Sequence, residues 1–346
     1  MTRLDDRIES SHSALDVHGS QALNIARESD VDYKDTQHPT LTTLPRVKSL
    51  FDSNQWITPV CNAMTVDVED YFQVSAIENF IARESWNKLE CRVQNNVDQI
   101  LDTFNEKGVK ATFFTLGWVG KRFPSMLRRI VAEGHELASH GWDHVRLVKF
   151  TPEQFRVDVE RAKATLEQLT GIEVRGYRAP SYSVAKSNLW VHDVLLETGH
   201  TYSSSIAPIQ YKEYGLPDAP RFSHYRKDKQ EVLQGTPGSI LEVPITTVRM
   251  GSRNIPCGGG GWFRLYPYRF SRWALERVNK FDKQPCVFYY HPWEIDVDQP
   301  RQANMNWNSR FRQYQNLSRM EGKVNRLLDD FNWCRMDEVF QVDQTR

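Results

Sequence analysis

Apolar positions follow two alternating patterns along residues 61 to about 340. Short apolar runs, such as 62–67 and 110–116, have the length of buried strands. Between them lie segments in which apolar residues repeat with a helical period, such as 97–104. The chain is therefore predicted to alternate strands with amphipathic helices.

The ends of these helices carry their own signals. Thr151, Pro152 and Gln154 combine an N-cap, a first-turn proline and a capping-box glutamine, and Gly171 closes the helix that they open. The pattern predicts further strands at 135–139, up to Arg178, and at 202–206, 240–246 and 287–291, and further helices at 126–131, 190–196, 270–281 and 311–328. Seven or eight strands in this alternation predict a parallel sheet, and about 280 ordered residues fit a closed or nearly closed β/α barrel better than two domains.

Residues 1–58 differ from the rest of the chain. Ser, Asp, His, Thr and Gln dominate, aromatic residues are sparse, and neither a helical nor a strand period persists. Such a composition is typical of disorder. We predict a disordered polar extension at 1–58 and one folded domain at 59–345.

The charge balance limits the classes of partner. The 346 residues contain 44 basic and 44 acidic side chains, and the net charge is zero. No global field therefore favours nucleic acid or an anionic membrane surface, so nucleic acid is not an expected partner.

Cysteine spacing and the N-terminal residues indicate in which cellular compartment the protein is expected. The five cysteines are scattered without a C-x-x-C pair, which argues against a disulfide framework and a thiolate zinc site and predicts reduced, mostly buried thiols. The first residues lack the basic start and apolar stretch of a signal peptide, and no run of about 18 apolar residues predicts a membrane span. The expected location is the cytoplasm.

Four short polar motifs each follow an apolar, strand-like run. They are Asp67-Val-Glu69-Asp70, His140-Gly-Trp-Asp-His144, Arg178-Ala-Pro-Ser181 and His291-Pro-Trp293. The carboxyl ends of successive strands in a β/α alternation meet at one face of the barrel. The sequence therefore predicts that the four motifs form a single site, with the character of a metal-dependent hydrolase.

The histidine pair is the strongest metal signal. Two histidines spaced i, i+4 can point the same way on a helical turn, and an acid from the first strand would complete a triad that leaves metal positions open. In the H-E-x-x-H pattern the general base lies between the histidines, whereas Gly141, Trp142 and Asp143 stand here. The base must come from elsewhere, and Asp67 is the candidate.

These residues resemble the NodB-homology polysaccharide deacetylases, carbohydrate esterase family 4. The family's four motifs correspond in order to Thr65–Asp70, His140–His144, Arg178-Ala-Pro180 and Tyr290-His291, and the resemblance covers residues 61 to about 340. The strings at 202–206, 217–222, 258–265 and 291–296 resemble the subfamily encoded beside exosortase-linked (PEP-CTERM) exopolysaccharide loci, whose C-terminal extension corresponds to about 210–345. The resemblance implies a distorted (β/α)7–8 barrel of the NodB-homology type.

The resemblance also implies roles for the motif residues. Asp67 would be the general base, Arg178 would hold it ionised and oriented, and His291 would protonate the leaving amine. His140, His144 and a second acid would bind a divalent metal, usually zinc. Both Glu69 and Asp70 are candidates for that acid, and Glu69 is favoured because residues two apart in a strand share a face.

Other side chains near the motifs are candidates for binding the substrate. Aromatic rings pack well against the C–H faces of sugars, although core packing is an alternative for each. The substrate-binding candidates are Tyr71, Trp142, Ser181, Tyr182, Trp262 and Trp293. Gly258–Gly261 lacks the Gly-Lys-[Ser/Thr] ending of a phosphate loop and is predicted to be a flexible rim loop, while His135 and His192 are predicted to be structural.

The function expected from the motifs and the resemblance is a zinc-dependent polysaccharide deacetylase acting on an N-acetylated glycan in exopolysaccharide synthesis or modification. Polysaccharide-assembly machinery at the membrane is an expected partner. Three alternatives remain open: hydrolysis of another non-peptide carbon–nitrogen bond on the same fold, an inactive carbohydrate-binding relative, and a non-haem iron oxygenase. The helix-rich alternation argues against the oxygenase, because those enzymes usually place H-x-[DE] on a jelly roll.

Overall fold

The computed structural model describes residues 60–211, 214–228, 230–232 and 235–342. The predicted extension at 1–58 lies outside these residues. Ten strands form the main sheet, in the order β11-β1-β2-β3-β4-β5-β8-β6-β7 with β12 beside β1, and β9 and β10 form a separate hairpin. Their bounds are β1 Cys61–Val68, β2 Thr112–Thr115, β3 Glu136–Ser139, β4 Gly176–Tyr177, β5 Tyr202–Ser203, β6 His224–Lys227, β7 Gln230–Val232, β8 Ile240–Glu242, β9 Thr247–Met250, β10 Arg253–Pro256, β11 Val287–Tyr290 and β12 Asn332–Cys334.

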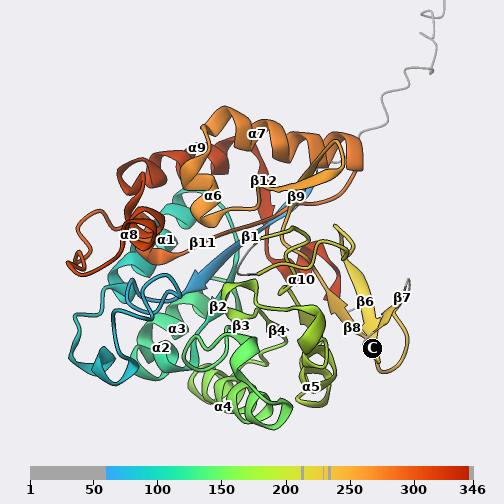
Figure 1. Ribbon diagram of the computed structural model, residues 1–346, viewed down its shortest axis with the longest axis horizontal. Coiled ribbons are helices and arrows are strands. Elements are labelled where there is room, and N and C mark those ends of the chain that lie inside the picture. Colours follow the sequence, from blue (N-terminus) through green and yellow to red (C-terminus); the bar gives the residue numbers. More distant parts are fainter. Residues whose placement is uncertain (1–59, 212–213, 229, 233–234, 343–346) are drawn as a thin grey trace, which may run out of the picture. The chain divides into compact units, whose positions relative to one another are not determined.

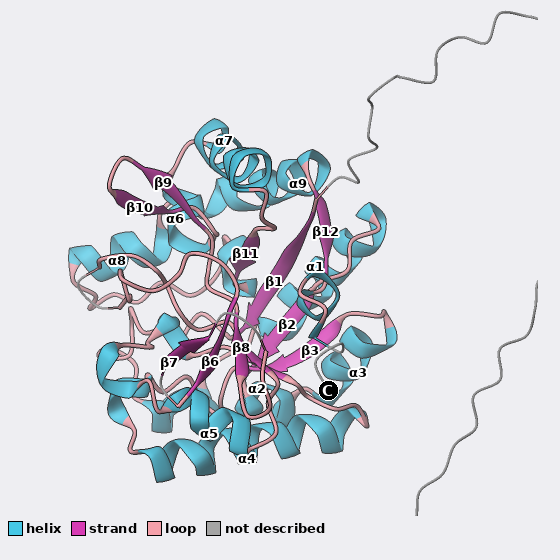
Figure 2. Ribbon diagram, turned by 90° about the vertical axis from the view of Figure 1, so that its right-hand side faces the viewer, coloured by secondary structure: helices cyan, strands magenta, loops and turns pink. Residues whose placement is uncertain are grey.

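The strands from β11 to β8 pair in parallel throughout, whereas at one end of the sheet β6 pairs antiparallel with both β8 and β7. Helices surround them, with α7 and α9 on one side and α4 and α5 on the other (Figures 1 and 2). The helices are α1 Val93–Lys107, α2 Gly117–Arg122, α3 Pro124–Ala132, α4 Pro152–Thr170, α5 Val191–Glu197, α6 Gly260–Leu265, α7 Tyr268–Arg277, α8 Trp307–Tyr314, α9 Met320–Asp330 and α10 Met336–Val339. Among the described helices, none combines the length and apolar character needed to cross a membrane. The predicted α/β fold is confirmed.

Strand β1 shows how the sequence positions the site. Met64, Val66 and Val68 are buried in the main core cluster under the helices. The alternate residues point to the opposite face, where the Thr65 hydroxyl and the Asp67 carboxylate both accept hydrogen bonds from the buried Arg178. The period-2 alternation of β1 therefore delivers Asp67 to the inside of the sheet, at its carboxyl end.

The two ends of the parallel set are bridged by a short segment. Cys257 N donates to the carbonyl of Thr246 at 3.2 Å, and Tyr289 N donates to the carbonyl of Gly258 at 2.8 Å. At Gly259, with φ 128°, an added Cβ would lie 1.9 Å from the carbonyl oxygen of Tyr289. The rim loop predicted at Gly258–Gly261 is corrected, because Gly259 lets the backbone pack directly against β11 and Gly260 begins α6.

The helix boundaries are correct where the capping signals are strong. Thr151 caps α4 with the predicted reciprocal bonds to Gln154. The single helix predicted at 311–328 is wrong, because the chain breaks between α8 and α9, where Asn316 adopts a left-handed conformation with φ 52°. An apolar helical period continued through this break, so the pattern alone did not reveal it.

The expectation that all five cysteines are reduced is contradicted. Cys61 and Cys334 form a disulfide across a sequence separation of 273 residues, with Cα atoms 6.0 Å apart. Both lie on adjacent parallel strands, β1 and β12. Cys91, Cys257 and Cys286 are free thiols. Spacing along the chain could not reveal a pair that only the sheet brings together.

Candidate active site

The four motifs meet around one cavity of about 390 Å³. They follow β1, β3, β4 and β11, whose carboxyl ends share one edge of the parallel sheet. Asp67, Glu69, His140, His144 and His291 line the cavity. The sequence prediction that these motifs converge therefore agrees with the geometry.

Glu69, His140 and His144 form a compact group of metal-binding character. One ligand atom from each lies within 4.8 Å of the others, and all three side chains are buried. Glu69 Oε2 lies 2.8 Å from His144 Nε2, and among the described residues it has no hydrogen-bond donor unless that nitrogen is protonated. Two imidazole nitrogens and a carboxylate are a donor set suited to zinc and similar divalent ions. The residues therefore fit the metal that the resemblance implies.

The protonation states also suit a metal site. Burial alone would raise the pKa of Glu69, but the neighbouring His144, His291 and His140 outweigh it and lower that pKa to about 2. Burial lowers the pKa of His140 to about 4. His140 Nδ1 lies 2.9 Å from the carbonyl oxygen of Arg178, which fits an Nδ1–H donor that leaves Nε2 for the cavity.

The two histidines converge through a loop and not through the helical turn that their spacing suggested. Gly141 and His144 both have left-handed backbone conformations, with φ 76° and 62°. Trp142 N donates to the Asp158 carboxylate at 3.0 Å, and the carbonyls of Gly141 and Trp142 accept from the first residues of α2. The loop is held from both α2 and α4, which fixes the histidine rings with centroids 5.3 Å apart.

Asp67 is held by a buried arginine. Arg178 is fully buried, and its Nη1 donates to Asp67 Oδ1 at 2.6 Å and to Thr65 Oγ1 at 2.7 Å. Its Nε donates to the carbonyl of Ser204 at 3.2 Å. This charge-assisted contact leaves Oδ2 of Asp67 facing His291, at 3.9 Å from Nε2.

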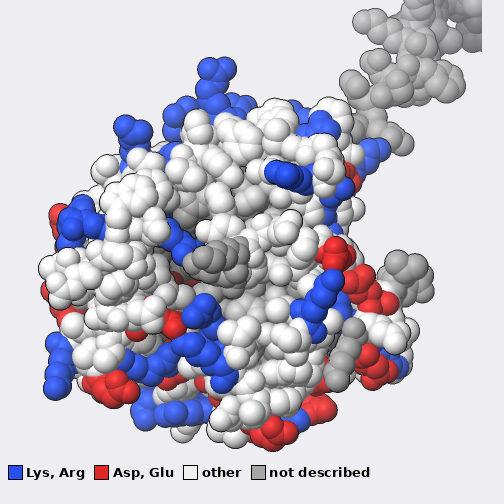
Figure 3. Space-filling view, viewed as in Figure 1, with Lys and Arg blue, Asp and Glu red and all other residues white. Residues whose placement is uncertain are grey.

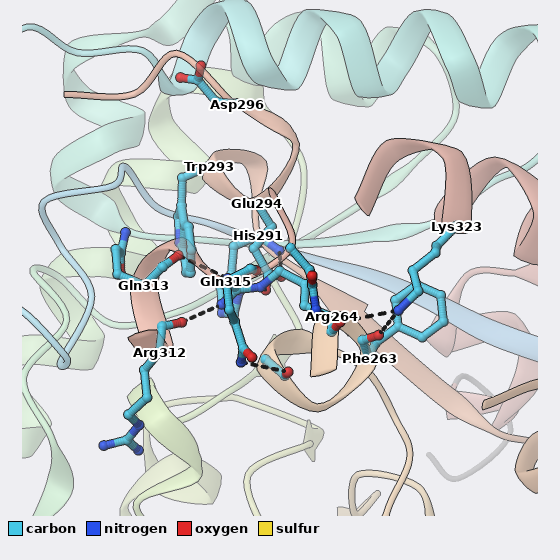
Figure 4. A network of polar contacts seen from close by, with 12 residues as sticks. Phe263, Arg264, His291, Trp293, Glu294, Asp296, Arg312, Gln313, Gln315 and Lys323 are labelled. Atoms are coloured by element: carbon cyan, nitrogen blue, oxygen red, sulfur yellow. Dashed lines mark hydrogen bonds and ion pairs between the residues drawn. The ribbon is translucent and has the colours of Figure 1, made fainter. Parts of the chain in front are cut away.

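His291 belongs to a buried network of polar side chains (Figure 4). Its Nε2 lies 3.6 Å from Glu69 Oε1, and its Nδ1 lies 3.0 Å from Glu294 Oε2. Arg264 Nε donates to the other oxygen of Glu294 at 2.6 Å. Burial would lower the pKa of His291, but Glu294, Glu69 and Asp67 outweigh it and raise that pKa to about 9. Sequence reasoning missed Glu294 and Arg264, although Glu294 lies only three residues after His291.

Asp70 does not face the metal-binding group. Its carboxylate accepts from the backbone N–H groups of Arg92 and Val93, at 2.8 and 3.0 Å, where α1 begins. Burial raises the pKa of Asp70 to about 6. Asp70 as a metal ligand is therefore a corrected expectation, because the strand has ended and its side chain turns toward the helix N-terminus.

Two of the predicted substrate contacts belong to the core. Tyr71 is buried in a cluster with Phe72 and Trp86, and it does not line the cavity. Trp142 packs under the guanidinium of Arg161, which lies 3.5 Å from the ring centroid. Both expectations are corrected: proximity in sequence to a motif did not bring these rings into the cavity.

The other predicted contacts do line the cavity. Ser181, Tyr182, Trp262 and Trp293 form part of its wall. Trp293 stacks on His291 with centroids 5.2 Å apart and donates from Nε1 to Glu69 at 3.1 Å. Sequence reasoning missed several further lining residues: Tyr211, Tyr214, Leu265, Tyr289, Phe311 and Arg312.

The surface carries charges of both signs. On the face seen in Figure 3, basic side chains (Lys and Arg) and acidic side chains (Asp and Glu) are interspersed, in keeping with the zero net charge.

His135 and His192 take the structural places expected of them. His135 Nδ1 accepts from the backbone N–H of Ala111 at 3.1 Å. His192 Nε2 lies 2.9 Å from Glu242 in a buried pair. Neither histidine lines the cavity.

Comparison with known proteins gives two family matches. Residues 86–202 match the family described as polysaccharide deacetylase, and residues 204–341 match a domain of unknown function, DUF3473. The chain is 32% identical over 91 residues to a peptidoglycan-N-acetylglucosamine deacetylase of Bacillus cereus, across 26% of this chain and 33% of that relative. The match thus spans about a third of the relative's length.

Two solved structures share the fold. One, from Mycobacterium smegmatis and assigned to the polysaccharide deacetylases, has a TM-score of 0.50 and 17% identity, and covers 84% of this chain and 94% of that one. The other, Puue allantoinase, has a TM-score of 0.51 and 13% identity, and covers 82% of this chain and 89% of that one. Identities this low show a common fold alone.

Proposed function

Residues 86–202 match the polysaccharide deacetylase family, and on that premise we propose that this chain is a metal-dependent hydrolase that removes acetyl groups from N-acetylated sugars of a glycan. The proposal rests on one observation: three groups of side chains lie around the same cavity. These are the Glu69–His140–His144 group, the carboxylate of Asp67 held by Arg178, and His291 opposite both.

Each residue has a defined task in this reaction. A divalent ion held by Glu69, His140 and His144, with zinc as our proposal, would supply Lewis acidity toward the acetyl carbonyl and the attacking water. Asp67 Oδ2 would take the proton from that water, while Arg178 on Oδ1 keeps the carboxylate oriented.

His291 completes the proton balance. Its Nε2 faces the same cavity and would give a proton to the amine nitrogen as the carbon–nitrogen bond breaks, so that acetate and a free amino sugar leave. Glu294 accepts at Nδ1 and fixes the ring direction. Trp293 and Tyr182 line the cavity and would flank the acetyl group.

Acetate release from N-acetylglucosamine oligomers tests this proposal. Purified protein is stripped of metal and then reloaded with zinc, with Asp67→Asn and His144→Ala as variants. We expect zinc-dependent release that both variants lose. Metal binding without acetate release would contradict the deacetylase proposal and favour another non-peptide carbon–nitrogen bond, and absence of metal binding would favour a carbohydrate-binding relative.

The biological setting is a further part of the proposal. We propose an exopolysaccharide as the natural substrate and polysaccharide-assembly machinery as the partner, on the sequence resemblance described above. The Cys61–Cys334 disulfide favours an oxidising compartment, because such bonds are rare in the reducing cytoplasm that the sequence suggested. Subcellular fractionation of the native source would separate the two locations.

A further inference from the structure

Two aromatic rings on α8 form an exposed stack at the rim of the cavity. The side chains of Trp307 and Phe311 lie one helical turn apart, with ring centroids 5.3 Å apart and planes within 14° of parallel. Trp307 is 73% exposed and Phe311 is 42% exposed. We call this pair the α8 stack. Leaving two large rings together in water forfeits the burial that each would gain in a core.

The α8 stack is continuous with the catalytic cavity. Phe311 lines the same cavity as Asp67, His144 and His291. A volume of about 390 Å³ is near the lower end of the 300–1,000 Å³ typical of ligand sites, so a glycan of several sugars must extend beyond it. Because Trp307 stacks on Phe311, a chain that leaves the cavity past Phe311 would come within reach of Trp307.

The stack is fixed in position relative to the reacting groups. Arg264 donates to the backbone carbonyls of Arg312, Gln313 and Gln315 at the end of α8, at 2.8 to 3.0 Å (Figure 4). The same guanidinium donates to Glu294, which holds His291. At the other end, the Asn306 side chain caps α8 by accepting from Ser309 N at 2.8 Å. The aromatic pair is thus preorganised with respect to His291.

The surroundings of the stack favour a hydroxyl-rich ligand. Asn308 and Arg310 are exposed on the same short helix, and they supply hydrogen-bond donors beside the rings. Aromatic faces next to amide and guanidinium donors suit a sugar, which combines apolar C–H faces with hydroxyl groups. A bilayer surface would call for a wider apolar patch than two rings.

We propose that the α8 stack is an external glycan subsite that binds sugar units outside the catalytic cavity, so that oligomers long enough to reach Trp307 bind more tightly than shorter ones. This proposal rests on the proposed deacetylase function and adds a second binding site for the same glycan. The residues concerned lie in the DUF3473 match, outside the part of the chain that matches the polysaccharide deacetylases.

The test compares short and long substrates in Trp307→Ala. Acetate release and direct calorimetric binding are measured with the N-acetylglucosamine dimer and hexamer. Loss of one stacked ring is expected to raise KM and Kd for the hexamer by about 3- to 10-fold, with kcat and the dimer constants unchanged. Trp307→Tyr should restore most of the hexamer binding, because it keeps an aromatic face.

Trp273→Ala is the matched control. Trp273 is also exposed, at 43%, and lies on α7 away from the cavity lining. It should change none of these constants, and circular dichroism should show all variants folded. Equal hexamer constants in wild type and Trp307→Ala, or a wild type that binds hexamer no more tightly than dimer, would overturn the subsite.

The two proposals fail in different ways. If wild type releases no acetate from either oligomer, the deacetylase proposal fails. Hexamer binding that Trp307→Ala weakens would still support the subsite in that case. If wild type releases acetate but length dependence is absent, only the subsite fails.

Discussion

The two halves of this chain contribute different things to one cavity. The part before residue 204 supplies the buried polar groups with fixed geometry, namely Asp67, Glu69, His140, His144 and Arg178. The part after it supplies His291 and most of the aromatic wall, including Tyr211, Trp262 and Phe311. Within the first part, residues 86–202 match the polysaccharide deacetylase family, and in the second part residues 204–341 match a domain of unknown function.

In the proposed reaction, the first part would carry most of the reacting groups, and the second would carry most of the surface that binds the glycan. His291 is the reacting group that comes from the second part. The first half holds its groups by strand ends and buried hydrogen bonds, which tolerate little change. The second half joins them through Arg264 and Glu294, which connect His291 to the end of α8. The reactive groups therefore meet only when both halves are folded together.

The largest effect should come from the base in the first half. Asp67→Asn should lower kcat for acetate release by about 10²- to 10⁴-fold, because the amide cannot accept the proton. Asp70→Asn is the matched control, since asparagine can still cap α1 and the group lies outside the cavity. Steady-state kinetics on metal-loaded protein measures both. Equal losses in the two variants would contradict the division of roles between Asp67 and Asp70.

A smaller effect should come from the link to the second half. Glu294→Gln leaves His291 without its charged partner at Nδ1 and should lower kcat by about 10- to 100-fold, with little change in KM. Glu276→Gln, in a surface ion pair with Arg272, serves as the control. If Glu294→Gln raised KM alone, Glu294 would belong to substrate recognition and not to the orientation of His291.

The disulfide joins the first strand of the domain to the last and should affect stability rather than catalysis. Cys61→Ser with Cys334→Ser should lower the free energy of unfolding by about 2–5 kcal/mol and leave kcat/KM unchanged. Thiol titration of the denatured, unreduced protein should find three free thiols, and five after reduction. Five free thiols before reduction would contradict the Cys61–Cys334 pairing and the oxidising compartment.

The sequence predicted much of the first half because local signals are strong there. Each apolar run there ends in a polar motif, so the convergence of Asp67, His140 and Arg178 followed from the parallel alternation. The capping box at Thr151 likewise fixed the start of α4. These features depend on residues that are close in sequence, so they can be recognised from the sequence of one protein.

What the sequence did not reveal depends on tertiary contacts. Asp70 directly follows Glu69 in the sequence, but the two carboxylates point to different places. Glu69 faces the cavity, whereas Asp70 faces the start of α1. Trp142 lies in a loop where Gly141 and His144 adopt left-handed conformations, and its ring packs against Arg161 and not in the cavity. Phe311 reaches the cavity from a helix that begins more than 230 residues after β1, and no periodicity reports such a contact.

The proposed function requires that Glu69, His140 and His144 hold a divalent metal. Anomalous diffraction at the zinc edge, on crystals of zinc-loaded protein, tests it most directly. We expect one strong peak about 2.0–2.2 Å from a Glu69 oxygen and from one ring nitrogen of each histidine. A peak bound by Asp70, or zinc-loaded crystals with no peak among these three residues, would contradict it.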